Sequence, residues 1–558
     1  LGVSCETIGL DGITANAFDS TVSTICDSSA CGLTLTQNEL NSITAAKLVI
    51  GDSSSGDIYV DGVNTSHISG GVTFNSSGSG GSVIFGAGGS VLKVATINAG
   101  NGVTINGDLS ITGSSVFNAD YDSSGTGTFT LAATKALTAL TISISANDVD
   151  ILGATSSGTG STTVAVSDGG TIGLGGTPGD MTISGTELGN ITAGTLNIGN
   201  SSTGNITVDG ISAANSNNAT TVNLTTGSAS SVSFSNNDST FNALTASGGS
   251  STSFGSGLTV TTDTGKLALN SVSLTSAGAL TLAGATGIDF GSGVTFTAGG
   301  DLTMSTTSGD IIGTGAFTLT STGDISLAEN FTTAGTTVIT ADSDGNGAGN
   351  FSNSSSTTLS TGNSALTLTA NDITLSGSIS SGTGSTTIAV SDGGTIGLGS
   401  TAGGMTISDT ELGNITAGTL NIGDSSTGNI TVDGISAANS NNATTVNLTT
   451  GSASSVSFSN NDSTFNALTA SGGSSTSFGS GLTVTTDTGK LALNSVSLTS
   501  AGALTLAGAT GIDFGSGVTF TAGGDLTMST TSGDIIGTGA FTLTSTGDIS
   551  LAENFTTA

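Results

Sequence analysis

The chain has 558 residues, with 39 Asp or Glu side chains against five lysines and no arginine, and a formal net charge of −34. Binding to nucleic acid or to anionic lipid depends on clustered basic side chains, so this balance excludes both kinds of partner. No run of 18 or more apolar residues is present, which excludes a transmembrane helix.

Gly, Ser, Thr and Asn dominate a chain that is still 35% hydrophobic, with a mean hydropathy of +0.25. Disordered chains combine low hydrophobicity with high charge, so this composition predicts a folded protein. The abundant residue types are weak helix formers, and we expect few long helices.

Residues 1–32 form a leader that contains the three cysteines, Cys5, Cys26 and Cys31. No Cys-x-x-Cys pair is present, which disfavours a zinc site. One disulfide with one remaining thiol fits an oxidising compartment, and the pairing stays open. Because Leu1 is not an initiator Met, we expect the N-terminus to be processed or cut from something longer.

Three related copies follow the leader: a contracted one at 33–118 and two long ones at 119–340 and 341–558. Residues Ser201–Ala334 recur unchanged as Ser425–Ala558, 224 residues later. In the first long copy the pattern continues beyond Ala334, whereas the second stops at Ala558. We therefore expect the chain to be a segment of a longer protein.

Within each copy, short apolar/polar alternations are separated by Gly-Asp, Ser-Gly and Thr-Gly pairs. Gly300–Met304, Phe317–Thr320 and Gly323–Leu327 are typical. Alternation with a period of two predicts half-buried strands, and the intervening pairs predict turns. Asp301 and Asp324 open similar strands 23 residues apart, a spacing that predicts one coil of a solenoid.

These features predict an all-β fold, a parallel β-helix (β-solenoid) rod built from long near-identical repeats. Coils of about 20–23 residues give about 25 coils and a rod of roughly 120 Å, because stacked strands lie about 4.8 Å apart. A row of separate β-sandwiches is the alternative, but it requires linkers and larger aromatic core residues than this sequence offers.

One repeated string resembles filamentous-haemagglutinin-like exoproteins, which are exported by two-partner secretion or as autotransporters. The string is Glu-Leu-x-x-Ile-Thr-Ala-x-x-Leu-x-Ile-Gly-x-x-x-x-Gly-x-Ile-x-Val, and it occupies Glu39–Val60, Glu187–Val208 and Glu411–Val432. The resemblance implies a right-handed β-helical fibre, secreted and displayed at a bacterial surface. It transfers no catalytic residue, since the repeats of that family carry none.

Asp342-Ser-Asp-Gly-Asn-Gly matches the first half of an EF-type calcium loop, with oxygen ligands in Asp342, Asp344 and Asn346. The equivalent loop of the preceding copy keeps Asp120 and Asp122. Position 12 is not Glu, so a complete EF-hand is excluded. Two interpretations stay open: a looser calcium site in a solenoid loop, or an ordinary polar turn.

Catalysis has little support in the sequence. His67 is the only histidine and has no nucleophile motif beside it, so we interpret it as a surface residue in a coil corner. A polysaccharide hydrolase or lyase on a β-helix is a remote alternative. Such enzymes need carboxylates together with Lys or Arg, and an acidic chain repels acidic polysaccharide.

The sequence therefore predicts a non-enzymatic extracellular structural fibre of a bacterial surface, either a filamentous adhesin or a matrix or filament component. A self-assembling surface-layer or sheath protein is the alternative. Expected partners are neighbouring chains, end-to-end or side-by-side, and a host-cell or polysaccharide ligand.

Overall fold

The computed structural model of the chain describes residues 7–11, 31–78 and 80–557, and side chains from residue 35 onward. Over these residues the protein is all-β, with about 4% helix, and forms a right-handed parallel β-solenoid of about 23 turns. The predicted fold class is thus confirmed. Two compact units are present: Leu1–Leu274 with Leu282–Asp289, and Thr275–Thr281 with Phe290–Ala558.

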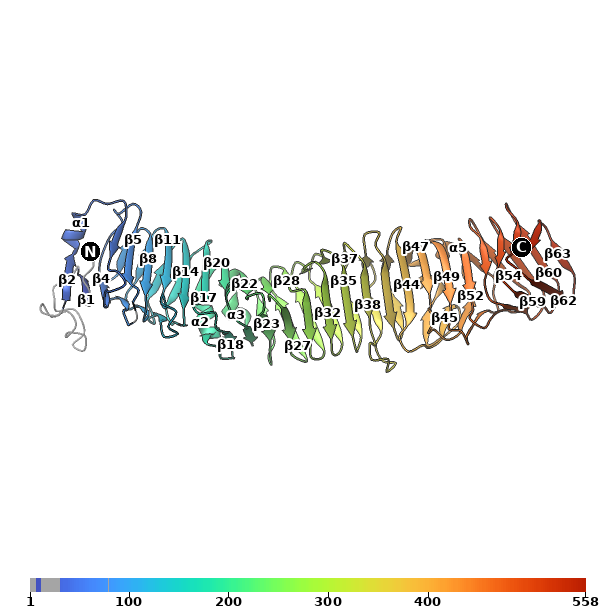
Figure 1. Cartoon of the computed structure of the whole chain (residues 1–558), viewed down its shortest axis with the longest axis horizontal. Helices are drawn as coiled ribbons and strands as arrows, with labels where there is room; N and C mark the ends of the chain where they lie inside the picture. The colour runs from blue at the N-terminus through green and yellow to red at the C-terminus, as the bar shows by residue number, and fades with distance from the viewer. Residues whose placement is uncertain (1–6, 12–30, 79, 558) are drawn as a thin grey trace. The chain divides into compact units, whose positions relative to one another are not determined.

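In the first unit, a coil consists of three short strands joined by turns. Three strands make up one coil, and the strands of the next coil pair with them in parallel. Strand β8 pairs with β11 (Figure 1), and β9 with β12 and β10 with β13. Their bounds are β8 Ala95–Ala99, β9 Val103–Ile105, β10 Leu109–Ile111, β11 Ser114–Asn118, β12 Thr128–Leu131 and β13 Ala136–Thr138.

The second unit repeats this arrangement. Strands β32, β33 and β34 stack on β35, β36 and β37, which in turn stack on β38, β39 and β40. Their bounds are β32 Val294–Ala298, β33 Leu302–Thr306, β34 Ile311–Gly313, β35 Phe317–Ser321, β36 Ile325–Leu327, β37 Phe331–Thr333, β38 Thr337–Thr340, β39 Phe351–Asn353 and β40 Thr358–Ser360.

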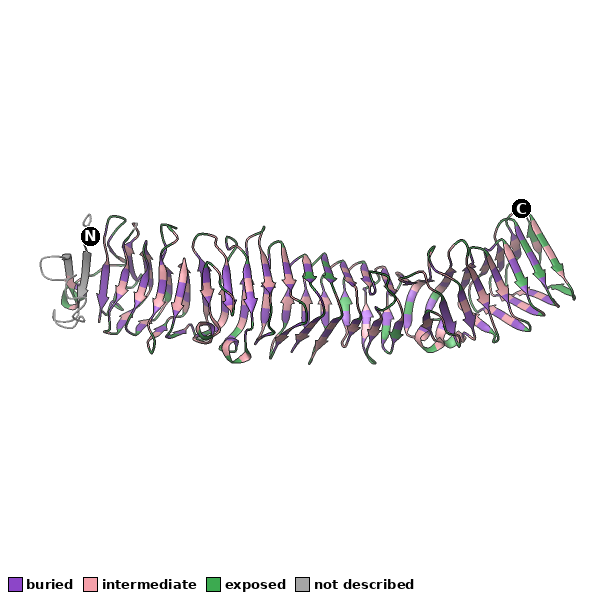
Figure 2. Cartoon of the chain, turned by 90° about the horizontal axis from the view of Figure 1, so that it is seen from below, coloured by how far each residue is buried: buried purple, intermediate pink, exposed green. Residues whose placement is uncertain are grey.

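The core lies inside the coils and consists of every second strand residue. In β35 the pattern alternates between buried and half-buried residues along the strand, as it does in most strands of both units (Figure 2). Phenylalanines of stacked coils meet there: Phe234 of β23 (Ser231–Phe234) and Phe254 of β26 (Ser251–Phe254) stack with ring centroids 5.2 Å apart. Apolar burial against the neighbouring coil is therefore the main stabilising interaction.

The predicted coil boundary at Asp301 and Asp324 is confirmed. Leu302 pairs with Ile325, and the Asp301 carboxylate accepts a hydrogen bond of 3.0 Å from the backbone N–H of Asp324. Other coils are longer, because insertions lie between their strands. Thr162 pairs with Leu196, 34 residues later. These insertions explain why the chain makes about 23 turns rather than the expected 25.

Five short helices are described: α1 Gln37–Asn41, α2 Gly185–Gly189, α3 Ala213–Ser216, α4 Asp409–Gly413 and α5 Ala437–Ser440. None of the helices in the described part of the chain is long and apolar enough to cross a membrane. Cys5 and Cys26 lie outside the described residues. Cys31 begins β2 (Cys31–Thr36), but its side chain also lies outside them.

Candidate functional site

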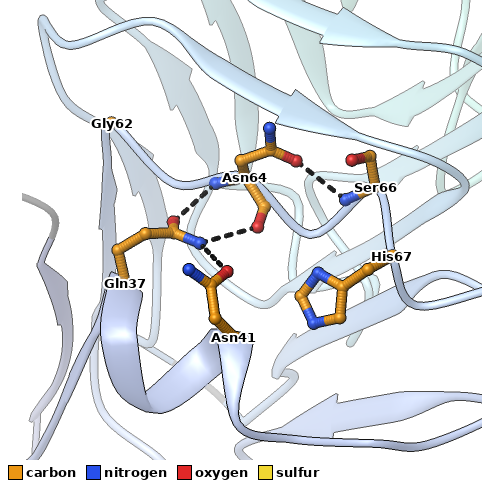
Figure 3. Close-up of a pocket in the computed structure, with 6 residues that line it drawn as sticks. All are labelled: Gln37, Asn41, Gly62, Asn64, Ser66 and His67. Carbon is orange, nitrogen blue, oxygen red and sulfur yellow. Dashed lines mark hydrogen bonds between the residues drawn. The ribbon is translucent and has the colours of Figure 1, made fainter.

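A polar depression lies between α1 and the segment that follows β4 (Ile58–Asp61). It encloses about 560 Å³ and is lined by six residues, shown in Figure 3: Gln37, Asn41, Gly62, Asn64, Ser66 and His67. None of these residues carries a carboxylate, and Gly62 has no side chain. The depression therefore offers amide, hydroxyl and imidazole groups for hydrogen bonding.

The Gln37 side chain pairs with a backbone segment in the way that one strand pairs with another. Its Nε2 donates to the carbonyl of Asn64 at 2.9 Å, and its Oε1 accepts from the backbone N–H of Asn64 at 2.7 Å (Figure 3). Gln37 Nε2 also donates to Asn41 Oδ1 at 2.7 Å. The Gln37 amide is thus already used to fix α1 to the segment.

His67 is exposed, and its Nε2 lies 3.1 Å from the carbonyl oxygen of Leu40. Because a carbonyl can only accept, this nitrogen carries the hydrogen in the contact. The group beside the ring is therefore a backbone carbonyl of the helix, which cannot act as a nucleophile. This contact joins the segment to α1 a second time.

The Asp120 loop follows β11. Asp120 is buried, and its carboxylate accepts hydrogen bonds from the Ser124 hydroxyl and N–H, from the Gly125 N–H and, at 2.6 Å, from the Ser167 hydroxyl. Burial raises the pKa of Asp120, but these hydrogen bonds outweigh it and hold the pKa below its usual value. Ser167 follows β17 (Ser161–Val166), which lies two coils beyond β11. Asp122 is exposed on the same loop.

The Asp342 loop in the second unit has the same construction. Asp342 is buried with a φ of 55°, and its carboxylate accepts from the N–H groups of Asn346 and Gly347 and, at 2.5 Å, from the Ser391 hydroxyl. Burial raises the pKa of Asp342, and the hydrogen bonds, that of Ser391 first, bring the net pKa below its usual value. Asn346 Nδ2 donates to Asp344 Oδ2 at 2.9 Å.

The predicted calcium ligands thus lie in two equivalent loops, in which Asp120 and Asp342 are buried whereas Asp122 and Asp344 are exposed. In each loop the buried carboxylate faces N–H and O–H donors, an arrangement that a polar turn also has. Among the residues that the structure describes, no three or more His, Cys, Asp or Glu side chains form a group able to hold a metal ion. The calcium site and the ordinary polar turn both stay open as interpretations of these loops.

The repeated string contains an edge-capping site that the sequence analysis did not identify. Helix α2 begins with a capping box, in which Ser184 and Glu187 bond each other's backbone N–H groups. The other carboxylate oxygen of Glu187 accepts from the N–H of Ile151 at 3.0 Å, and Asn190 Nδ2 donates to the carbonyl of Ile151 at 2.9 Å. Ile151 ends β15 (Asp148–Ile151), an edge strand of its sheet. Two side chains therefore replace the missing neighbouring strand.

The same site recurs in the second unit. Glu411 of α4 accepts from the N–H of Leu375 at 3.0 Å, and Asn414 Nδ2 donates to the carbonyl of Leu375 at 2.8 Å. Leu375 ends β42 (Ile373–Leu375), which is again an edge strand. The capping box was readable as Ser-x-x-Glu in the sequence, but the contact with a strand 36 residues earlier was not.

Comparison with models of known protein families, with curated proteins and with solved structures finds no match.

Proposed function

We propose that the chain is a non-enzymatic structural segment of an extracellular fibre at a bacterial surface, as an adhesin shaft or a matrix filament. The observation that carries the proposal is the recurrence of the edge-capping site, Glu187 with Ile151 and Glu411 with Leu375, in two copies whose coils stack alike. In both copies an edge strand is capped by the same pair of side chains. Whole copies can therefore be added to the chain, and each added copy makes the same contacts as the one before it.

Surface location is supported by the resemblance of the repeated string to filamentous-haemagglutinin-like exoproteins. It is also supported by the composition, since five lysines in 558 residues leave few cleavage sites for trypsin-like proteases. Acidic side chains exposed on the coils keep such a chain soluble and separate from its neighbours.

Electron microscopy of native cells with antibodies raised against residues 201–334 tests this function. Labelled thin filaments that project from the surface support the adhesin or matrix fibre. A labelled two-dimensional lattice supports the surface-layer alternative instead. Label confined to the cell interior contradicts both.

A further inference from the structure

Four stacked strands of the second unit carry seven threonines on their outward face. The strands are β32, β35, β38 and β41 (Leu366–Ala370), and the eighth position is Val338. We call the following residues the threonine array: Thr295, Thr297, Thr318, Thr320, Thr340, Thr367 and Thr369. All seven are exposed or half-buried.

The array repeats in two directions because the strands stack in register. Thr295 pairs with Thr318 and Thr297 with Thr320, and each column continues through β38 to β41. Stacked strands lie about 4.8 Å apart, and alternate residues of one strand about 6.7 Å apart. The hydroxyl groups therefore form a nearly rectangular lattice.

These hydroxyl groups are free to bind a ligand. None of the seven makes a side-chain hydrogen bond to another residue of the described chain, whereas hydroxyls elsewhere do, such as Ser381 to Thr386 at 2.8 Å. The four strands contain no charged and no outward-facing aromatic residue. The array therefore has no counter-charge for a charged ligand and no aromatic side chain on which a sugar ring could stack.

The size of the array limits the partner further. Four strands of four or five residues cover roughly 300 Å² at the usual strand spacings. A stable protein complex buries about 800 Å² on each partner, so the threonine array by itself is too small to hold a second copy, although its sheet continues beyond β32 and β41. The net charge of −34 also opposes such pairing.

We propose that the threonine array binds the surface of an ice crystal. Ice presents uncharged oxygen atoms in a flat lattice whose repeats are close to those of the array, and it is both donor and acceptor, as a hydroxyl is. The threonine methyl groups add apolar surface that orders adjacent water. The first two strands of the array recur in the last copy, with their four threonines at Thr519, Thr521, Thr542 and Thr544.

The test compares two variants of the full chain, each carrying four added lysines. The array variant carries Thr318→Lys, Thr320→Lys, Thr542→Lys and Thr544→Lys. The control carries Thr303→Lys, Ser326→Lys, Thr527→Lys and Ser550→Lys, which lie in paired positions on another sheet. Circular dichroism and thermal unfolding establish that both are folded.

Fluorescently labelled protein is then frozen into a slowly growing ice crystal, and the inhibition of ice recrystallisation is measured. We expect incorporation and inhibition by the natural chain and by the control, and loss of both by the array variant. Exclusion of the natural chain from ice overturns the proposal. Equal loss of ice incorporation and inhibition in the folded array variant and the folded control also overturns it. Binding of the natural chain to microcrystalline cellulose without binding to ice does so too.

Discussion

Glu187 Oε1 on α2 accepts a hydrogen bond from the backbone N–H of Ile151, 36 residues earlier and at the edge of a sheet. The same carboxylate caps its own helix through Ser184. One side chain therefore satisfies donors at the start of a helix and at the end of a sheet. The glutamate that begins the repeated string has this double role in both long copies.

Replacing Glu411 tests this role in the second unit. Glu411→Ala leaves the N–H groups of Leu375 and Ser408 without their acceptor, and we expect a loss of about 1–3 kcal/mol in local stability. Hydrogen exchange at the Leu375 amide reports it directly. Glu329→Ala is the control, since Glu329 has no hydrogen bond to the described residues. Unchanged protection of Leu375 in Glu411→Ala would refute the capping role.

Part of this architecture was predictable from the sequence. The strand period, the turns and the 23-residue coil of Asp301 and Asp324 depend on local residues, and all three are present. The contacts of Glu187 with Ile151 and of Asp120 with Ser167 depend on which coils stack, which no local pattern encodes. The two loops of the calcium prediction were found as equivalent, but their serine partners two coils away were not.

Among the positions at which the two long copies differ, one tests the contacts between neighbouring helices: Asp409 in the second copy and Gly185 in the first. Asp409 accepts from the N–H and hydroxyl of Ser436 and from Asn439 Nδ2, whereas its counterpart is Gly185. We expect Gly185→Asp to stabilise the first unit by about 0.5–1.5 kcal/mol, through hydrogen bonds to Ser212 and Asn215 and the N-terminal position on α2. Urea unfolding measures the gain.

The reverse change, Asp409→Gly, is the matched control and should cost a similar amount. A Cβ at Gly185 lies 2.7 Å from the amide nitrogen of Asn215, so that flexible side chain has to shift. A lower urea midpoint for Gly185→Asp would show that the shift outweighs the new hydrogen bonds.

Acid weakens the Asp342 loop in a predictable direction. Its pKa lies below the usual value in the folded chain, so its stabilisation is complete above about pH 5 and is lost as the pH falls below about 4 and through the folded pKa. Ser391→Ala removes a donor and raises that pKa. We expect the variant to be less stable at pH 7, with a smaller gap to the natural chain at pH 3.

Urea midpoints of both proteins at the two pH values give this gap. Ser343→Ala is the control, because the exposed Ser343 hydroxyl has no hydrogen-bond partner in the described chain. A gap that stays constant between pH 7 and pH 3 would show that Ser391 acts through packing alone.

Calcium titration separates the two interpretations of this loop. Because protein donors already bond the Asp342 carboxylate, we expect EDTA and millimolar calcium to give the same thermal unfolding midpoint. A midpoint that rises with calcium, and no longer does so in Asp344→Asn, would establish the calcium site.

Deleting one long copy tests directly whether the copies act as units of length. Deleting residues 201–424 joins Asn200 to Ser425, which begins a segment identical to the one that begins at Ser201. At the average number of residues per turn of the solenoid, the deletion removes about nine turns. Negative-stain electron microscopy of both purified chains measures particle length. We predict folded particles shorter by about 43 Å, at about 4.8 Å a turn. Unfolded particles, or particles of unchanged length, would contradict the structural fibre.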